Sequence, residues 1–121
     1  MFLKDAKTEA AARWVAQVKK WIQSYQEKGF KGYIVFANPE DRPHIEALAK
    51  KHEVAFPLTY FPKGLEDPGA KTYQINPKAE STVLLTLRDR VVANFVNLKP
   101  EQWAEVEKGI RKMLELPESQ Q

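Results

Sequence analysis

Residues 33–37 of this chain read Tyr-Ile-Val-Phe-Ala, a continuous β-prone run between Gly32 and an Asn-Pro turn. A strand with one face in water alternates apolar and polar residues, whereas this run has no polar break. It therefore predicts a strand that is buried on both faces and lies in the middle of a sheet. Because such a strand needs cover on both sides, the run favours an α/β protein.

Two amphipathic helices are predicted to cover this strand, one over residues 8–28 and one over residues 100–115. Asp5 or Thr8 can cap the first helix, and Gly29 suits the left-handed residue just past its end. The apolar stripe of the first helix contains Ala11, Trp14, Val15, Val18, Trp21, Ile22 and Tyr25. That of the last helix contains Trp103, Val106, Ile110, Met113 and Leu114.

The middle of the chain predicts two shorter helices around an extended segment. Pro43 suits the first turn of a helix that ends near His52. Apolar residues then alternate along residues 54–60, but Pro57 lacks the N–H that a β-ladder needs, so this segment is expected at a sheet edge. A short helix is expected around residues 70–73.

The last third of the chain predicts an antiparallel hairpin before the final helix. Residues 82–87 and 91–96 are β-prone and mainly apolar, and the charged residues 88–90 lie between them. This pattern is typical of two strands joined by a charged tip. Without any linker or repeat, we expect one domain over residues 1–116, followed by a polar tail at residues 117–121.

The order of these elements defines the expected architecture. If Phe2 and Leu3 belong to a first strand, a helix separates the first two strands, which therefore pair in parallel through a right-handed crossover. The hairpin adds antiparallel strands and the last helix covers a face, so we expect a three-layer α/β/α sandwich with a mixed central sheet. Because the first strand is so short, we also expect residues upstream of Met1 in a parent protein.

Four stretches resemble the thioredoxin-like superfamily, and its peroxiredoxin and thiol-disulfide-reductase type more closely than thioredoxin itself. GYIVFANPED resembles the strand and turn after the first helix, VAFPLTYF the extended segment of that group, AKTYQI its short helix and STVLLTLRDRVVANFV its terminal hairpin. The resemblance covers residues 1–115 and implies a thioredoxin-like sandwich.

The chain departs from the superfamily where the redox chemistry of those enzymes is located. They carry one or two cysteines between the first strand and the first helix, whose N-terminus lowers the thiol pKa. Residues 4–10 here read Lys-Asp-Ala-Lys-Thr-Glu-Ala, and the chain contains no cysteine. Ser81 stands where the family has a cis-proline, so the peptide bond between Glu80 and Ser81 is expected to be trans. We therefore expect no catalytic residue and no thiol redox activity.

The resemblance also implies where a remaining function would lie. In the thioredoxin-like architecture the loop after the first strand meets the residue before the hairpin strand, so Asp5, Lys7, Thr8 and Ser81 are expected close together. A crevice at the carboxyl ends of parallel strands is a favoured ligand site. A protein partner or small ligand could use the hydroxyls of Thr8 and Ser81 and the charge of Lys7. The simpler alternative is that these residues only cap a helix and form turns.

Other site chemistry has little support in the sequence. His44 and His52 lie eight residues apart, about 80° around a helix, with no obvious third ligand, so both are expected at the surface and no metal site is predicted. Glu40, Asp41 and Glu46 cluster near a helix start, where negative charge offsets the helix dipole. The five glycines are scattered, so no phosphate loop is expected. These observations predict no cofactor.

The charge pattern argues against nucleic acid and membranes as partners. Nineteen basic and 16 acidic residues are interleaved, which indicates a mixed, solvated surface with a net charge of +3. Arg88, Arg90 and Lys99 could form a small basic surface, but no RNA-binding motif accompanies them. No apolar run approaches the roughly 20 residues that cross a bilayer, and no signal peptide is visible, so a soluble protein is expected.

These observations favour a redox-inactive thioredoxin-like domain that acts in binding or scaffolding, alone or as a module of a larger protein. The alternative is a thiol oxidoreductase or peroxidase domain whose cysteines lie in a segment upstream of Met1. A third interpretation, weak nucleic-acid binding, would show a steep dependence of affinity on salt.

Overall fold

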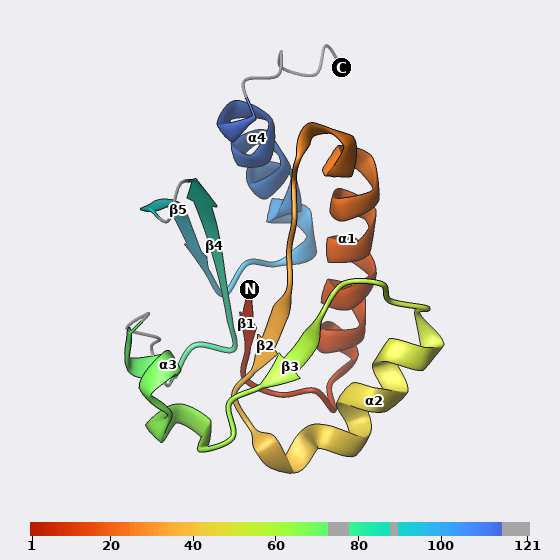
Figure 1. Ribbon diagram of the computed structural model, residues 1–121, viewed down its shortest axis with the longest axis vertical. Helices are drawn as coiled ribbons and strands as arrows, with labels where there is room; N and C mark the ends of the chain where they lie inside the picture. Colours follow the sequence, from red (N-terminus) through yellow and green to blue (C-terminus); the bar gives the residue numbers. More distant parts are fainter. Residues whose placement is uncertain (73–77, 88–89, 115–121) are drawn as a thin grey trace.

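The computed structural model describes residues 1–72, 78–87 and 90–114 (Figure 1). The sheet and helix elements are β1 (Phe2–Leu3), α1 (Glu9–Tyr25), β2 (Ile34–Phe36), α2 (Arg42–Lys51), β3 (Leu58–Tyr60), α3 (Pro68–Thr72), β4 (Ser81–Leu87), β5 (Arg90–Val96) and α4 (Trp103–Met113). This order is the one that the sequence predicts. Among the described residues, no helix is both long enough and apolar enough to cross a membrane.

The strands form a mixed five-stranded sheet in the order β3-β2-β1-β4-β5. β1, β2 and β3 run parallel, whereas β4 pairs antiparallel with both β1 and β5. The mixed sheet, its hairpin and the edge position of β3 confirm the predictions. Pro57 precedes β3, where it needs no ladder N–H, and its carbonyl accepts the N–H of Ile34 at 3.1 Å.

The central strand is the shortest element of the sheet. β1 has two residues, yet Phe2 lies opposite Val35 of β2 on one side and Thr82 of β4 on the other. β2 is buried at every position, as the apolar run predicts. Tyr33, which the run also includes, precedes the strand and is 46% exposed. The predicted burial is therefore wrong at Tyr33 and right for the three residues of the strand.

α1 forms as its pattern predicts. The hydroxyl of Thr8 caps the helix by accepting the N–H of Ala11 at 3.1 Å. A turn of 3-10 helix follows, and Gly29, with φ of 88°, ends it in the left-handed region that favours glycine. The predicted stripe is buried apart from the half-buried Ile22.

α1, α2 and α4 pack on one face of the sheet, and α3 packs on the other. Successive right-handed crossovers in one direction, from β1 to β2 to β3, place α1 and α2 together. Their face is formed by alternate strand residues: Leu3, Ile34, Phe36, Val83 and Leu85. On the opposite face Phe2 and Val35 contact Phe61 and Ala70. The described layer on that face is therefore much thinner.

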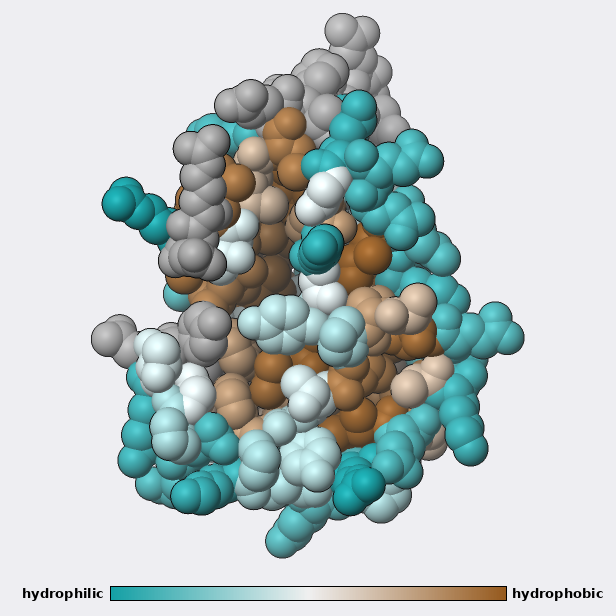
Figure 2. Space-filling view, in the orientation of Figure 1, coloured by the Kyte–Doolittle hydropathy of each residue, from teal (hydrophilic) through white to brown (hydrophobic). Residues whose placement is uncertain are grey.

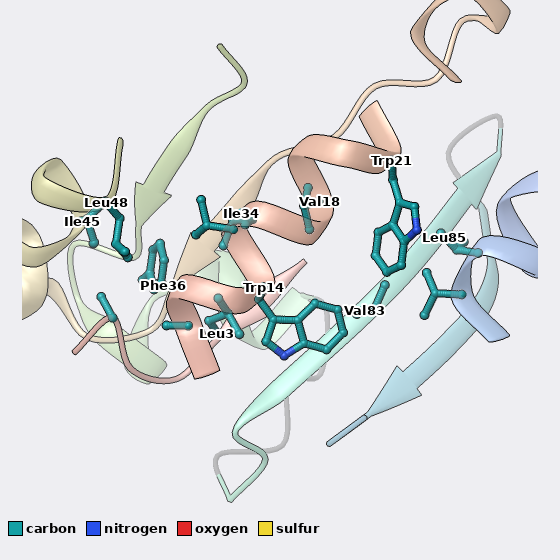
Figure 3. Packing of buried hydrophobic residues seen from close by; sticks show 14 of the residues in the cluster. Leu3, Trp14, Val18, Trp21, Ile34, Phe36, Ile45, Leu48, Val83 and Leu85 are labelled. Atoms are coloured by element: carbon teal, nitrogen blue, oxygen red, sulfur yellow. The ribbon is translucent and has the colours of Figure 1, made fainter. Parts of the chain in front are cut away.

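Tryptophan side chains pack between α1, α4 and β4 in the thicker helical layer. Figure 3 shows Trp14 and Trp21 of α1 lying over β4, beside Val83 and Leu85. The ring centroids of Trp14 and Trp103 are 5.1 Å apart, which joins α1 to α4. Trp14 and Trp21 are each only 4% exposed, so both side chains belong to the core, as the stripe of the first helix predicts.

Three predictions concern residues at the limits of the description. α3 ends at Thr72, so the expected extension of the short helix to Tyr73 lies outside the described residues. Residues 88–89 of the charged tip and the polar tail at 117–121 also lie outside them. The described chain contains no cis peptide bond, so the bond between Glu80 and Ser81 is trans, as expected.

Ile110 tests the predicted core role of α4, because its side chain is 0% exposed. Replacing a buried isoleucine by alanine loses burial and leaves a cavity, so Ile110→Ala should lower the free energy of unfolding by about 2–5 kcal/mol. Lys108→Ala, at an exposed position of the same helix, should change it by less than about 0.5 kcal/mol. Urea titrations followed by circular dichroism measure both values. Equal effects of the two changes would contradict the packing described.

Candidate binding site

The loop of residues 4–8 joins β1 to α1 at the carboxyl end of the parallel strands. The N–H of Lys4 donates to the carbonyl of Glu80 at 3.0 Å, and Leu3 lies opposite Ser81. The loop and the start of β4 therefore share one end of the sheet. This is the place that the sequence suggests for a ligand.

The four residues proposed for this site have different environments. Asp5 accepts the N–H of Lys7 at 2.8 Å in a turn, and Thr8 caps α1. Ser81 is 5% exposed, and its carbonyl accepts the N–H of Asn97 at 3.0 Å. Lys7, by contrast, has a side chain that is 55% exposed. Local hydrogen bonds thus engage Asp5 and Thr8, while Asp5 and Lys7 are the two charged residues of the four and both are exposed.

Asp41 is the residue at this end that the sequence analysis assigned only to a helix start. It is 0% exposed, and its Oδ2 accepts the N–H of Ala6 at 2.9 Å. Its Oδ1 lies 3.5 Å from Nζ of Lys7. Asp41 follows β2 in the chain, just as the 4–8 loop follows β1. Because the carboxyl ends of adjacent parallel strands lie at the same edge of a sheet, the sequence could have indicated the contact between Asp41 and this loop.

The charge state of Asp41 follows from these contacts. Burial acts to raise the pKa of this carboxyl, but the Ala6 N–H, the Asp5 side chain and the Lys7 ammonium together hold it below its ordinary value of 3.8. Asp41 is therefore an ionised group that ties the loop to the start of α2. The Ala6 N–H and the Lys7 ammonium already stabilise the negative charge of Asp41, which suits a structural role better than acid or base catalysis.

Within the described part of the chain, the surroundings of this carboxylate differ from the ligand clusters of metal sites. Over residues 1–72, 78–87 and 90–114, no three His, Cys, Asp or Glu side chains come together as a metal site would require. His44 is exposed as expected, whereas His52 is half-buried, with an Nε2 atom that contacts no solvent.

An apolar groove lies at the opposite end of β1, and the sequence analysis did not anticipate it. Its volume is about 340 Å³, a size typical of small-ligand pockets. Residues 29–33 form one wall and residues 83–87 of β4 form the other. The floor comes from Val18 and Trp21 of α1 and from Val106, Ile110 and Met113 of α4. In Figure 2 apolar residues are gathered in this hollow.

Met1 closes one end of the groove. Its amino group donates to the carbonyl of Tyr33 at 3.1 Å, and its carbonyl accepts the N–H of Val35 at 2.8 Å. Burial lowers the pKa of this terminal ammonium from 8.0 to about 6. Lys31 also lines the groove, whereas no acidic residue is found among its described lining residues. The groove is thus apolar, and Lys31 is the one charged side chain among its described lining residues.

No protein-family model, no curated protein and no solved structure matches this chain.

Val18 and Val15 provide a matched test of the groove. Both are nearly buried on α1, but only Val18 lines the hollow. Enlarging a residue inside a filled core costs about 1–3 kcal/mol, so Val15→Phe should lower the free energy of unfolding by that amount. The added ring of Val18→Phe can extend into the groove, so this change should lower the free energy of unfolding by less than about 1 kcal/mol. Chemical denaturation measures the free energy of unfolding of both variants. Similar decreases in Val15→Phe and Val18→Phe would mean that the groove cannot accept a larger side chain.

Asp41 predicts a pH dependence of stability. Because its pKa is lower in the folded chain than in the unfolded one, its charge contributes stability above pH 3.8 that is lost as the pH falls through the acid range. Asp41→Asn should therefore lower the free energy of unfolding at about pH 7, by about 1–3 kcal/mol. Near pH 3, the free energies of unfolding of the wild type and of Asp41→Asn should differ less than they do at neutral pH.

The control for this prediction is Glu40→Gln, which removes a charge from an exposed neighbouring position. Urea titrations across the pH range should show almost no change for that variant. A difference between the wild type and Asp41→Asn that stays constant from neutral to acid pH would contradict the role assigned to the carboxylate.

Proposed function

We propose that this chain is a redox-inactive, thioredoxin-like domain whose function is to bind another molecule. The apolar groove of about 340 Å³ is the observation that carries the proposal, since its size is typical of small-ligand pockets. The thioredoxin-like part is supported by the strand order and by the parallel β1 and β2 beside an antiparallel hairpin. It rests on the resemblance of the sequence.

The loop between β1 and α1 supports the redox-inactive part of the proposal. The resemblance places the thiol of the enzymes in this loop, near the N-terminus of α1. Here the hydroxyl of Thr8 accepts the N–H of Ala11, and Lys7 lies within ion-pair distance of Asp41. The hydroxyl of Thr8 is thus engaged in capping α1, and the loop sequence contains no thiol that could take part in disulfide exchange.

The alternative, a thiol enzyme with cysteines upstream of Met1, has less support. Such residues would precede β1 and therefore enter the fold at the groove, at the other end of the strand from the start of α1. The helix N-terminus that lowers a thiol pKa would then be distant from the thiol. A parent reading frame with cysteines immediately before Phe2 would favour this alternative.

The absence of cysteine predicts no thiol-based turnover, because the thiolate is the nucleophile in disulfide exchange. Insulin reduction and peroxide consumption, each measured with a dithiol reductant, should equal the buffer blank. Activity that follows the protein peak through a second purification would contradict the redox-inactive assignment.

Binding in the groove can be tested with anilinonaphthalene sulfonate, an apolar anion whose fluorescence rises in an apolar site. The folded chain should bind it saturably with a stoichiometry of one. Val18→Phe should weaken the binding by about tenfold, because the added ring occupies the groove. Val92→Ser is the control, since Val92 is 52% exposed on β5 and is not part of the groove. Loss of binding in the control alone would overturn the proposed site.

A further inference from the structure

The two edges of the sheet differ in how they are protected from a further strand. β3, at one edge, has three residues and follows Pro57, and both shortness and proline discourage pairing with another strand. β5, at the other edge, has seven residues, and Figure 1 shows it at the outer border of the sheet. Arg90 is the only charged residue of β5, and the strand contains no proline. β5 is therefore the edge that is open to another strand.

β5 also presents apolar side chains to solvent. Val91, Val92 and Val96 are each about half exposed. Ala93 and Phe95 are half-buried, because they pack against the core on the helical face of the sheet. A long, apolar and nearly uncharged edge strand is a typical place for strand addition, since main-chain hydrogen bonds and side-chain burial then act together.

The register of β5 on β4 shows which backbone groups of β5 face outward. The N–H of Asn97 donates to the carbonyl of Ser81 at 3.0 Å, so Asn97 directs its backbone groups toward β4. Backbone groups of successive strand residues point to alternate sides. Phe95 therefore bonds to β4, whereas Asn94 and Val96 direct their N–H and C=O groups to the outer side. Within the described residues, no strand of the sheet pairs with that side of β5.

β5 is complementary to itself when two copies run antiparallel about Asn94. In this register Asn94 lies opposite Asn94 of the second copy, where the two amides can donate to and accept from each other. Val92 lies opposite Val96 of the second copy, and the small Ala93 lies opposite the large Phe95. A register centred on Phe95 would instead place Asn94 opposite Val96 and so pair a polar residue with an apolar one. The first register matches polarity and size, and brings no like charges together.

We propose that the chain forms a symmetric dimer in which β5 pairs antiparallel with β5 of a second copy. The twofold axis passes between the two Asn94 residues, perpendicular to the sheet, so the two sheets become one continuous sheet. Such a contact uses the same surface on both copies and closes the assembly at two. A strand pair buries less than the roughly 1,200 Å² of a tight interface, so the dimer is reversible, with a dissociation constant in about the micromolar range. The inference goes beyond the proposed function and does not depend on the groove.

Sedimentation equilibrium of the full chain tests the dimer. The mass should rise from 13.9 kDa toward twice that value as the protein concentration increases from about 1 µM to about 1 mM. Asn94→Asp, which hardly changes the shape of the side chain, places two carboxylates opposite each other and should raise the dissociation constant by about tenfold at neutral pH. Added salt should reduce this effect, because it screens the like charges. Thr59→Asp, on the β3 edge, is the control and should leave the dissociation constant unchanged.

The register can be tested with single introduced thiols, because the chain contains no cysteine. Residues opposite each other at a hydrogen-bonded position have Cα atoms about 5.5 Å apart, within the range that a disulfide spans. Asn94→Cys should therefore form a covalent dimer under mild oxidation. Val96→Cys, on the same strand, should react much more slowly, because the two copies of residue 96 are about 13 Å apart along the strands. Circular dichroism confirms that each variant is folded.

A mass of 13.9 kDa at every concentration would overturn the inference. So would assemblies that grow beyond two copies, equal cross-linking of Asn94→Cys and Val96→Cys, or a dissociation constant that Asn94→Asp leaves unchanged. Weakening of the dimer by Val18→Phe but not by Asn94→Asp would place the contact at the groove and contradict the role of β5. Binding of anilinonaphthalene sulfonate reports on the groove alone, so a failure of the dimer leaves the proposed function standing.

Discussion

The two residues of β1 are the constraint on which the rest of the structure depends. Phe2 and Leu3 are the only residues of this strand, yet they connect β2, in the parallel half of the sheet, to β4, in the hairpin. They are 6% and 3% exposed, and each belongs to a different apolar cluster. One short strand therefore joins the halves of the sheet and contributes to the core on both faces.

The ends of β1 differ because their surroundings differ. Beyond Leu3 the chain turns into α1, and the buried carboxylate of Asp41 holds that turn by accepting the N–H of Ala6. At the Met1 end, residues 29–33, β4 and two helices line an apolar groove. The end that the thioredoxin-like resemblance associates with chemistry is thus filled by polar contacts, while the end without such an association remains open.

The local pattern was sufficient for most of the fold. The stripe from Ala11 to Tyr25 predicts α1 because a helix buries residues at one angular position, and Thr8 and Gly29 indicate its ends through their own conformational preferences. Pro57 indicates an edge because it lacks an N–H. The candidate site was harder to predict: Asp5, Lys7 and Thr8 are neighbours in sequence, but Asp41, which accepts the N–H of Ala6, lies 35 positions away from it.

The sequence by itself determined the element order, the buried character of β2, the two apolar stripes and the absence of cysteine side chains. Each of these follows from residue type and from spacing within about twenty residues. Over that distance the periodicity of a helix or strand determines which face of the element a residue occupies. Only the tertiary structure decided that Asp41 is ionised inside the protein and that a groove opens beside Met1. Both depend on contacts between residues that are distant in sequence, such as Ala6 with Asp41 and residues 29–33 beside β4, and local periodicity does not record such contacts.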